Sequence, residues 1–255
     1  MQQGNLQQKK RYHLLDNIRG LTLLSMIAYH GTWDLVYLYG VNFPWYEGKM
    51  AFLWQQSICW TFILLSGFCW SFSKKPLKQG LLVSGAGLVV TITTLIFSYE
   101  SRIIFGVLTL LGASALLMIP LKPLFEKISA VAGLILMFAL FAFTYEVNLG
   151  NLGIFGWEMI DLPLGMYRNL VTTFIGFTDL EFYSSDYFSL MPWVFLYFAG
   201  YFLYRLWKED KIPSAKCLNH HIPVLTWLGK KSLIIYMIHQ PVLYGLLEII
   251  KISCN

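Results

Sequence analysis

The chain alternates between long apolar stretches and short polar connections. Proline is expected to end the fourth stretch at Pro120 and Pro123, because proline cannot continue a helix interior. Each stretch approaches the roughly 20 residues that a helix needs to cross a membrane. The stretches cover residues 15–39, 50–73, 79–98, 103–120, 128–145, 188–207 and 228–250. The pattern predicts an all-α, polytopic membrane helix bundle of about seven transmembrane helices, formed by a single domain over residues 1–255.

One connection is much longer than the others. Residues 146–187 separate the fifth and sixth stretches and are rich in glycine, asparagine, aspartate and aromatic residues. A structureless loop of this length is unusual in a compact protein and is commonly functional. We therefore expect this loop to take part in function.

The composition supports a membrane protein. The chain is 56% hydrophobic and 13% charged, whereas soluble proteins average about 45–50% apolar and about 25% charged residues. Many aromatic residues lie near the ends of the apolar stretches, as an interfacial belt requires. The net charge of +5 forms no basic stripe with interleaved aromatics. The expected surroundings are therefore a lipid bilayer, and no nucleic-acid partner is expected.

The basic residues predict how the chain crosses the membrane. If the amino terminus is cytoplasmic, fifteen of the nineteen lysines and arginines fall on the inner side, three of them in a basic inner loop over 208–227. The four exceptions are Lys49, Arg102, Arg168 and Lys251. The long loop is acidic instead, with Glu146, Glu158, Asp161, Asp179, Glu181 and Asp186. This positive-inside pattern predicts a cytoplasmic amino terminus and an outer carboxyl terminus.

The first apolar stretch carries ionisable residues at the level of the membrane. Such groups are costly in hydrocarbon and persist mainly where they line a cavity or take part in chemistry. Asp16 and Arg19 stand three residues apart, so they share a helix face and can pair. One interpretation is a structural ion pair at the inner interface, with the arginine reaching toward water. The other is that Arg19 binds a phosphate of an anionic ligand, which its planar guanidinium suits.

Two histidines lie deeper along the predicted helices. His30 stands roughly 21 Å of helix rise beyond Asp16, in the outer half of the membrane, and Asp34 follows one turn later. A carboxylate beside an imidazole fixes its tautomer and supports general-base catalysis. His239 precedes Pro241, which frees a backbone carbonyl and kinks the helix. For each histidine the alternative is a packing role with a hydrogen bond to a neighbouring helix.

Several familiar motifs are absent from the sequence. There is no GxGxxG, P-loop, HExxH or GxSxG motif and no cluster with metal-ligand spacing. We therefore expect no metal site and no permanently bound cofactor. A small-molecule transporter or permease that uses the same intramembrane polar residues is one alternative, although the two related halves common in transporters are not evident. A non-catalytic membrane module does not account for histidines at helical depth.

Four motifs together resemble one family of membrane enzymes. The first is Arg11-x4-Asp16-x2-Arg19-Gly20 followed by His30, and the others occupy residues 104–112, 182–193 and 229–241. They occur in the expected order across nearly the whole chain. The chain resembles the heparan-alpha-glucosaminide N-acetyltransferase catalytic-domain family, within the wider group of multi-pass membrane acyltransferases.

The resemblance implies an activity and a set of substrates. It implies transfer of an acetyl or similar acyl group from cytosolic acyl-CoA, such as acetyl-CoA, to an amine or hydroxyl of an extracytoplasmic glycan or sugar. Acyl-CoA is then a co-substrate, and the membrane is the cytoplasmic membrane of a bacterium-like cell. A homodimer stays an open alternative.

The resemblance also suggests roles for individual residues. His30, oriented by Asp34, would act as general base or form an acyl-histidine intermediate, and His239 would help to stabilise the oxyanion. The residues expected to contact acyl-CoA are Asp16, Arg19, Tyr236 and Gln240. The residues expected to hold the acceptor are Trp157, Tyr183 and Asp186.

Two departures from the family pattern limit the substrate. Many relatives have a histidine where this chain has Thr109. The lysosomal members place a histidine after the first helix, and residues 41–49 here contain none. The acyltransferase class is therefore expected for this chain, whereas the heparan substrate is not.

Overall fold

The computed structural model describes residues 12–154, 156–209 and 221–254. The chain forms two compact units, one from residues 1–58 with 213–255 and the other from residues 59–212. The boundary between them lies within α2 (Lys49–Trp70). Among the basic residues predicted for the inner side, Lys9, Lys10, Arg11, Lys211 and Lys216 lie outside the described residues.

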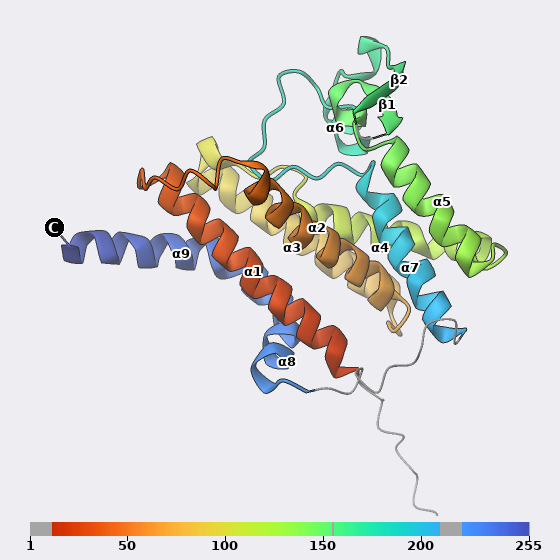
Figure 1. The fold of residues 1–255 in the computed structure, drawn as a ribbon, viewed down its shortest axis with the longest axis horizontal. Coiled ribbons are helices and arrows are strands. Elements are labelled where there is room, and N and C mark those ends of the chain that lie inside the picture. The colour runs from red at the N-terminus through yellow and green to blue at the C-terminus, as the bar shows by residue number, and fades with distance from the viewer. Residues whose placement is uncertain (1–11, 155, 210–220, 255) are drawn as a thin grey trace, which may run out of the picture. The chain divides into compact units, whose positions relative to one another are not determined.

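The first unit is built around α1 (His13–Tyr37), which packs against α8 (Pro223–Lys230) and α9 (Ser232–Cys254) (Figure 1). The close approach of α1 to α8 requires glycine. A Cβ at Gly20 would lie 2.1 Å from the carbonyl oxygen of Leu225, and one at Gly229 would lie 2.0 Å from that of Asp16. The predicted single stretch over 228–250 is therefore wrong at its start, because α8 is a separate short helix that packs on α1.

The second unit contains two helix pairs. Helix α3 (Pro76–Phe97) packs on α4 (Val107–Phe125), and α5 (Ala130–Phe143) packs on α7 (Trp193–Lys208) (Figure 1). Small residues lie at the contact, since a Cβ at Gly112 would meet Ser84 in α3. Such residues let membrane helices approach closely. The largest fully buried side chains of this unit include Ile63, Leu110, Met118, Phe141, Leu196 and Phe202.

The prolines of the fourth predicted stretch do not end the helix. Helix α4 runs through Pro120 and Pro123 to Phe125, five residues beyond the predicted end at residue 120. The last turn is held from outside, because Arg205 Nη1 donates hydrogen bonds to the carbonyl oxygens of Phe125 and Ile128, each at 2.7 Å. Arg205 thus provides donors for carbonyl oxygens at and just beyond the end of α4, where a helix leaves carbonyls without partners.

The long loop carries regular structure, so the all-α prediction needs one amendment. Strands β1 (Asn151–Ile154) and β2 (Trp157–Asp161) pair antiparallel beyond the end of α5, with an irregularity between Leu152 and Gly153 (Figure 1). The loop also contains the 3₁₀ turns η2 (Val147–Leu149) and η3 (Leu164–Met166), and the helix α6 (Leu170–Ile175). A further turn, η1 (Tyr99–Ser101), lies between α3 and α4.

The described helices are those of an integral, multi-pass membrane protein. Within the described ranges, five segments are long and apolar enough to cross a membrane: α2, α3, α4, Ala130–Leu149 and Ser232–Ile250. Helix α3 exposes large apolar side chains, including Leu82, Leu88 and Phe97, as a lipid-facing helix does. Helix α7 has 16 residues, and α1 carries the charged residues described above. The count of seven crossings and the orientation of the amino terminus stay predictions.

Candidate functional site

The amino-terminal part of α1 holds its polar residues in contacts with the protein. Arg19 Nη1 lies 3.6 Å from Asp16 Oδ1. Thr226 Oγ1 of α8 donates a buried hydrogen bond of 2.6 Å to Asn17 Oδ1. The expected pair of Asp16 and Arg19 is thus formed, and α8 adds a polar partner that sequence reasoning missed.

The carboxyl-terminal half of α1 meets α9 at a pair of histidines. The ring centroids of His30 and His239 lie 5.0 Å apart. Beside them, Gln240 Nε2 donates to Asp34 Oδ1 at 3.2 Å, and Asp34 is only 1% exposed. We call His30, Asp34, His239 and Gln240 the histidine site.

The hydrogen bond of Asp34 differs from the expectation. The sequence pattern suggested that Asp34 orients His30, but among the described residues its hydrogen-bond partner is Gln240. The Gln240 amide must present its nitrogen to Asp34, because a carboxylate accepts and does not donate. Asp34 therefore connects α1 to α9, and no described hydrogen bond fixes the tautomer of His30.

A backbone carbonyl sets the tautomer of His239. Its Nδ1 lies 2.5 Å from the carbonyl oxygen of Tyr236, one helical turn earlier. A carbonyl only accepts, so Nδ1 must carry the proton. In the neutral ring the lone pair then lies on Nε2. This atom is buried and has no hydrogen-bond partner among the described residues.

Three buried atoms of the histidine site have unused hydrogen-bonding capacity. Asp34 Oδ2, Gln240 Oε1 and His239 Nε2 each lack a partner within the described part of the chain. A buried polar group without a partner costs about 1–3 kcal/mol, and each such group in a native structure calls for an explanation. Since all three are acceptors, the site is suited to a ligand that brings N–H or O–H groups.

A group of aromatic side chains lies on one side of His30 and contacts it through Tyr29. The ring of Tyr29 lies 5.8 Å from that of His30, and the ring of Tyr46 lies 5.3 Å from Tyr29. Tyr46 is 4% exposed and donates to the Tyr29 carbonyl oxygen at 3.1 Å. Burial raises the pKa of Tyr46 above its ordinary value, so it stays a neutral donor. Trp54 Nε1 fixes α2 to α1 through Ser25 Oγ at 2.8 Å.

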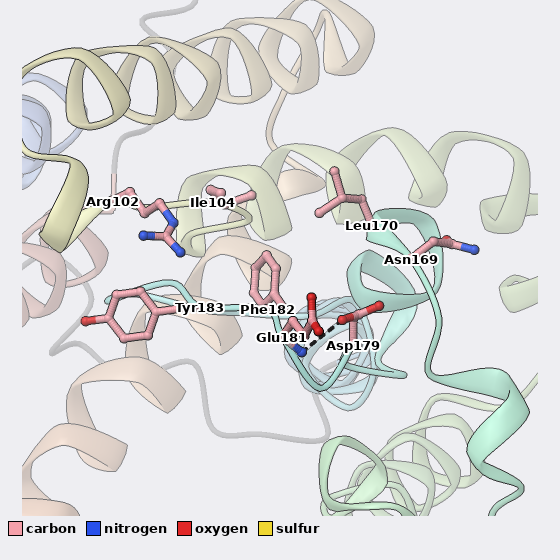
Figure 2. Close-up of a pocket in the computed structure, with 8 residues that line it drawn as sticks. All are labelled: Arg102, Ile104, Asn169, Leu170, Asp179, Glu181, Phe182 and Tyr183. Atoms are coloured by element: carbon pink, nitrogen blue, oxygen red, sulfur yellow. Dashed lines mark hydrogen bonds between the residues drawn. The ribbon is translucent and has the colours of Figure 1, made fainter.

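The second unit contains a pocket of about 390 Å³ (Figure 2). We call it the loop pocket. It is lined by Arg102, Ile104, Asn169, Leu170, Asp179, Glu181, Phe182 and Tyr183. Sequence reasoning missed its charged lining residues, although Arg102 stood out as an exception to the positive-inside pattern.

The three predicted acceptor residues occupy different places in the second unit. Tyr183 lines the loop pocket. Trp157 belongs to β2 and is 79% exposed. Asp186 lies beside the start of α4, where the Val107 N–H faces Asp186 Oδ2 at 3.5 Å. Their common role in binding an acceptor stays a prediction.

Comparison with known proteins identifies a family. The family model described as "Heparan-alpha-glucosaminide N-acetyltransferase, catalytic" matches residues 11–241. No curated protein and no solved structure matched the chain. The match covers all four motifs and confirms the resemblance inferred from them.

Proposed function

The chain belongs to the heparan-alpha-glucosaminide N-acetyltransferase catalytic-domain family, a family of membrane acetyltransferases, and we propose that it is an acyltransferase. The acetyl or similar acyl group passes from cytosolic acyl-CoA to an amine or hydroxyl of an extracytoplasmic sugar or glycan. One observation carries the proposal. Three buried acceptor atoms lie unpaired, among the described residues, at a site with two adjacent histidine rings. An amine or hydroxyl acceptor supplies the N–H or O–H groups that such a site lacks.

The tautomer of His239 supports a role as general base. Nε2 takes the proton of the acceptor as its nitrogen or oxygen attacks the thioester carbon, and the CoA thiolate leaves. His30 then donates from its ring to the developing oxyanion. These two roles are exchanged relative to those suggested by sequence. An acyl-imidazole on either histidine is the covalent variant.

Asp34 and Gln240 position the acceptor in this mechanism. Gln240 joins Asp34 to α9 and stands next to His239 in the chain. The second carboxylate oxygen of Asp34 and the amide oxygen of Gln240 accept from other N–H or O–H groups of the sugar, and so hold its attacking nitrogen or oxygen in line. Positioning of this kind contributes strongly to catalysis.

The acyl-CoA enters from the cytoplasmic side, where Arg19 binds its phosphates together with inner-side lysines. Arg19 is 24% exposed and keeps Asp16 as a neighbour, which orients the guanidinium. The pantetheine arm then extends along α1 to the histidine site, past Tyr236 and Gln240. The acidic outer loop, with Trp157, Tyr183 and Asp186, holds the sugar. The membrane in which the protein resides is the cytoplasmic membrane.

Thermal unfolding with acetyl-CoA tests the donor. A ligand that binds the folded state stabilises it by about 2.7 kcal/mol at 100 times its Kd. We expect acetyl-CoA to raise the unfolding midpoint of the wild type and of His30→Ala, and to raise that of Arg19→Ala much less. Lys49→Ala, which removes an exposed basic residue predicted for the outer side, is the matched control and keeps the full shift.

The outcomes separate an enzyme from a transporter. Release of CoA that depends on a sugar amine, together with the midpoint shift, supports acyl transfer. No shift at saturating acetyl-CoA in any variant contradicts the proposal and favours a transporter that uses the same polar residues.

A further inference from the structure

The loop pocket is built by two loops and α6 within the second unit. Residues 102–105 and 184–188 are joined by hydrogen bonds from Ser185 N to the Arg102 carbonyl at 3.0 Å and from Phe188 N to the Phe105 carbonyl at 2.8 Å. Ile104 N also donates to Ser184 Oγ at 2.9 Å. The two segments therefore form a connected frame for the pocket.

One backbone position in this frame is strained. Phe105 has a φ of +58°, a left-handed conformation that is uncommon for a phenylalanine. Its ring is held against Phe174 at 5.2 Å and Phe182 at 6.1 Å. Strain of this kind costs about 1–3 kcal/mol and clusters at binding sites. The contacts of Phe105 therefore hold the frame beside the pocket in a costly backbone conformation.

Arg102 presents an unpaired positive charge to the pocket. Its guanidinium lies over the rings of Tyr99 and Tyr183, with centroid distances of 4.6 and 5.1 Å. One of its five donors goes to the Tyr99 carbonyl at 3.3 Å, and no carboxylate of the described residues forms an ion pair with it. The planar fork is thereby held in place and keeps donors for a phosphate or carboxylate.

Two carboxylates lie on the opposite side of the pocket. Figure 2 shows the ring of Phe182 between Arg102 on one side and Asp179 and Glu181 on the other. Glu181 N donates to Asp179 Oδ1 at 2.9 Å, and Asp179 N donates to Thr173 Oγ1 at 2.9 Å. These bonds fix the acidic turn, and neither carboxylate forms an ion pair within the described ranges.

The placement of opposite charges on two sides of the pocket favours a ligand that carries both signs of charge. A simple anion would meet two carboxylates in the same pocket, and a simple cation would meet Arg102. Glu181 is exposed and Arg102 and Asp179 are half-buried, so water also solvates these charges. A ligand with both signs can pair with the two sides together, whereas a ligand with one sign meets a repelling group.

The pocket also lies near the ends of membrane helices. Arg102 follows α3, which ends at Phe97, and precedes α4, which begins at Val107. Both helices are long and apolar enough to cross a bilayer. The connection between them therefore emerges at the level of lipid headgroups.

We propose that the loop pocket binds a zwitterionic group, with a phosphate held by Arg102 and a primary ammonium held by Asp179 and Glu181. The volume of about 390 Å³ is at the lower end of the range of about 300–1,000 Å³ for small-molecule sites. The group comes either from the headgroup of an ethanolamine phospholipid or from a soluble phosphorylated amine. Binding of this group does not require acyl transfer, although Tyr183 belongs both to the pocket lining and to the predicted acceptor residues.

Ligand-observed NMR with three small probes tests the proposal. The full-length protein in phosphatidylglycerol nanodiscs, whose headgroup carries no ammonium, is titrated with phosphoethanolamine, with ethyl phosphate and with ethanolamine, and saturation transfer reports binding. We expect phosphoethanolamine to bind at least about tenfold more tightly than either single-charge probe, since each lost ion contact is worth roughly that factor. Equal signals from all three probes would overturn the proposal.

Variants assign the binding to the pocket. Arg102→Met and the double variant Asp179→Asn with Glu181→Gln each reduce phosphoethanolamine binding at least about tenfold, and Arg102→Lys reduces it less because the charge remains. Arg168→Met and Glu158→Gln change exposed charges outside the pocket lining and keep full binding. Binding that survives Arg102→Met in a protein with an unchanged unfolding midpoint contradicts the proposal.

A change of lipid identifies the source of the ligand. In nanodiscs that contain phosphatidylethanolamine, a headgroup in the pocket competes with soluble phosphoethanolamine and lowers its apparent affinity. An unchanged affinity assigns the pocket to a soluble phosphorylated amine. Both results require the zwitterionic site, and neither depends on whether acyl transfer is found.

Discussion

The two ends of α1 differ in whether their buried polar side chains have partners within the protein. Near its start, Asn17 accepts from Thr226 and Arg19 lies beside Asp16. The exception there is His13, whose ring packs on His221 but whose Nδ1 has no hydrogen-bond partner among the described residues. Near its end, Asp34 keeps one oxygen buried without a partner among the described residues. Both ends belong to one helix and one unit.

This contrast separates structure from function along a single helix. Polar groups that find partners within the protein contribute to folding, because a buried hydrogen bond offsets the cost of leaving water. Polar groups left without partners lower the stability of the ligand-free protein. A role other than stability must therefore explain why the sequence retains them. In this chain we infer that the role is binding and catalysis. The contrast predicts different consequences for substitutions at the two ends.

The largest effect is expected for His239. His239→Ala removes the proposed general base, and we expect the rate of acyl transfer to fall by about 10²–10⁴-fold, the usual contribution of such a group. The unfolding midpoint should fall, because the buried ring and its hydrogen bond to the Tyr236 carbonyl are lost, so the rates are compared at a temperature at which both proteins are folded. The rate of CoA release and the melting curve are measured on the same preparation.

A matched pair of glycines on α1 tests the other end. Gly20→Ala places a methyl group 2.1 Å from the Leu225 carbonyl oxygen, so α8 must move away. We expect a loss of about 1–3 kcal/mol in the free energy of unfolding. Gly31→Ala meets only Leu243 Cδ2 at 3.6 Å, an ordinary contact, and alanine favours a helix by up to about 1 kcal/mol. Equal destabilisation by both changes would show that the α1–α8 contact has no special role.

Asp34→Asn should weaken activity without weakening the fold. Asparagine keeps an oxygen for Gln240, but it replaces the second acceptor atom with a donor. We expect about a tenfold lower rate, equivalent to about 1.4 kcal/mol, with an equal or higher unfolding midpoint because a buried charge is removed. A lower midpoint with unchanged activity would reverse the interpretation of this residue.

The smallest effect is expected for Thr226→Val. The substitution keeps the shape of the side chain and removes its hydrogen bond to Asn17. The expected loss is about 0.5–1.5 kcal/mol of stability, while the rate of acyl transfer at saturating substrate stays unchanged. A strong loss of activity in a stable Thr226→Val protein would mean that the start of α1 also belongs to the catalytic machinery.

The sequence predicted the helices more completely than the sites. Long apolar stretches identify membrane helices because hydrocarbon requires them, and each predicted stretch corresponds to a helix of the described residues. The short helix α8 escaped prediction because its eight residues are held by α1, which no local pattern records. The hydrogen bonds of Arg205 to the end of α4 likewise come from another helix and have no local signal in the sequence.

The histidine site was predicted in part. The spacing of His30 and Asp34 was visible in the sequence, whereas the pairing of His30 with His239 joins residues on different helices. The tautomer of His239 follows from a carbonyl distance that only coordinates provide. For the loop pocket, the sequence indicated Tyr183 as an acceptor residue, the acidic residues of the long loop, and Arg102 as a departure from the positive-inside pattern. It did not show that these residues line one pocket.

The most direct test of the account measures acetyl-CoA binding and turnover in the same His239→Ala protein. Purified protein in nanodiscs is given acetyl-CoA and an amino sugar such as glucosamine, and both the shift of the unfolding midpoint and the release of CoA are recorded. The account predicts that His239→Ala keeps the acetyl-CoA-dependent shift and loses sugar-dependent CoA release. CoA release at the wild-type rate from this variant would contradict the assignment of the histidine site as the catalytic centre.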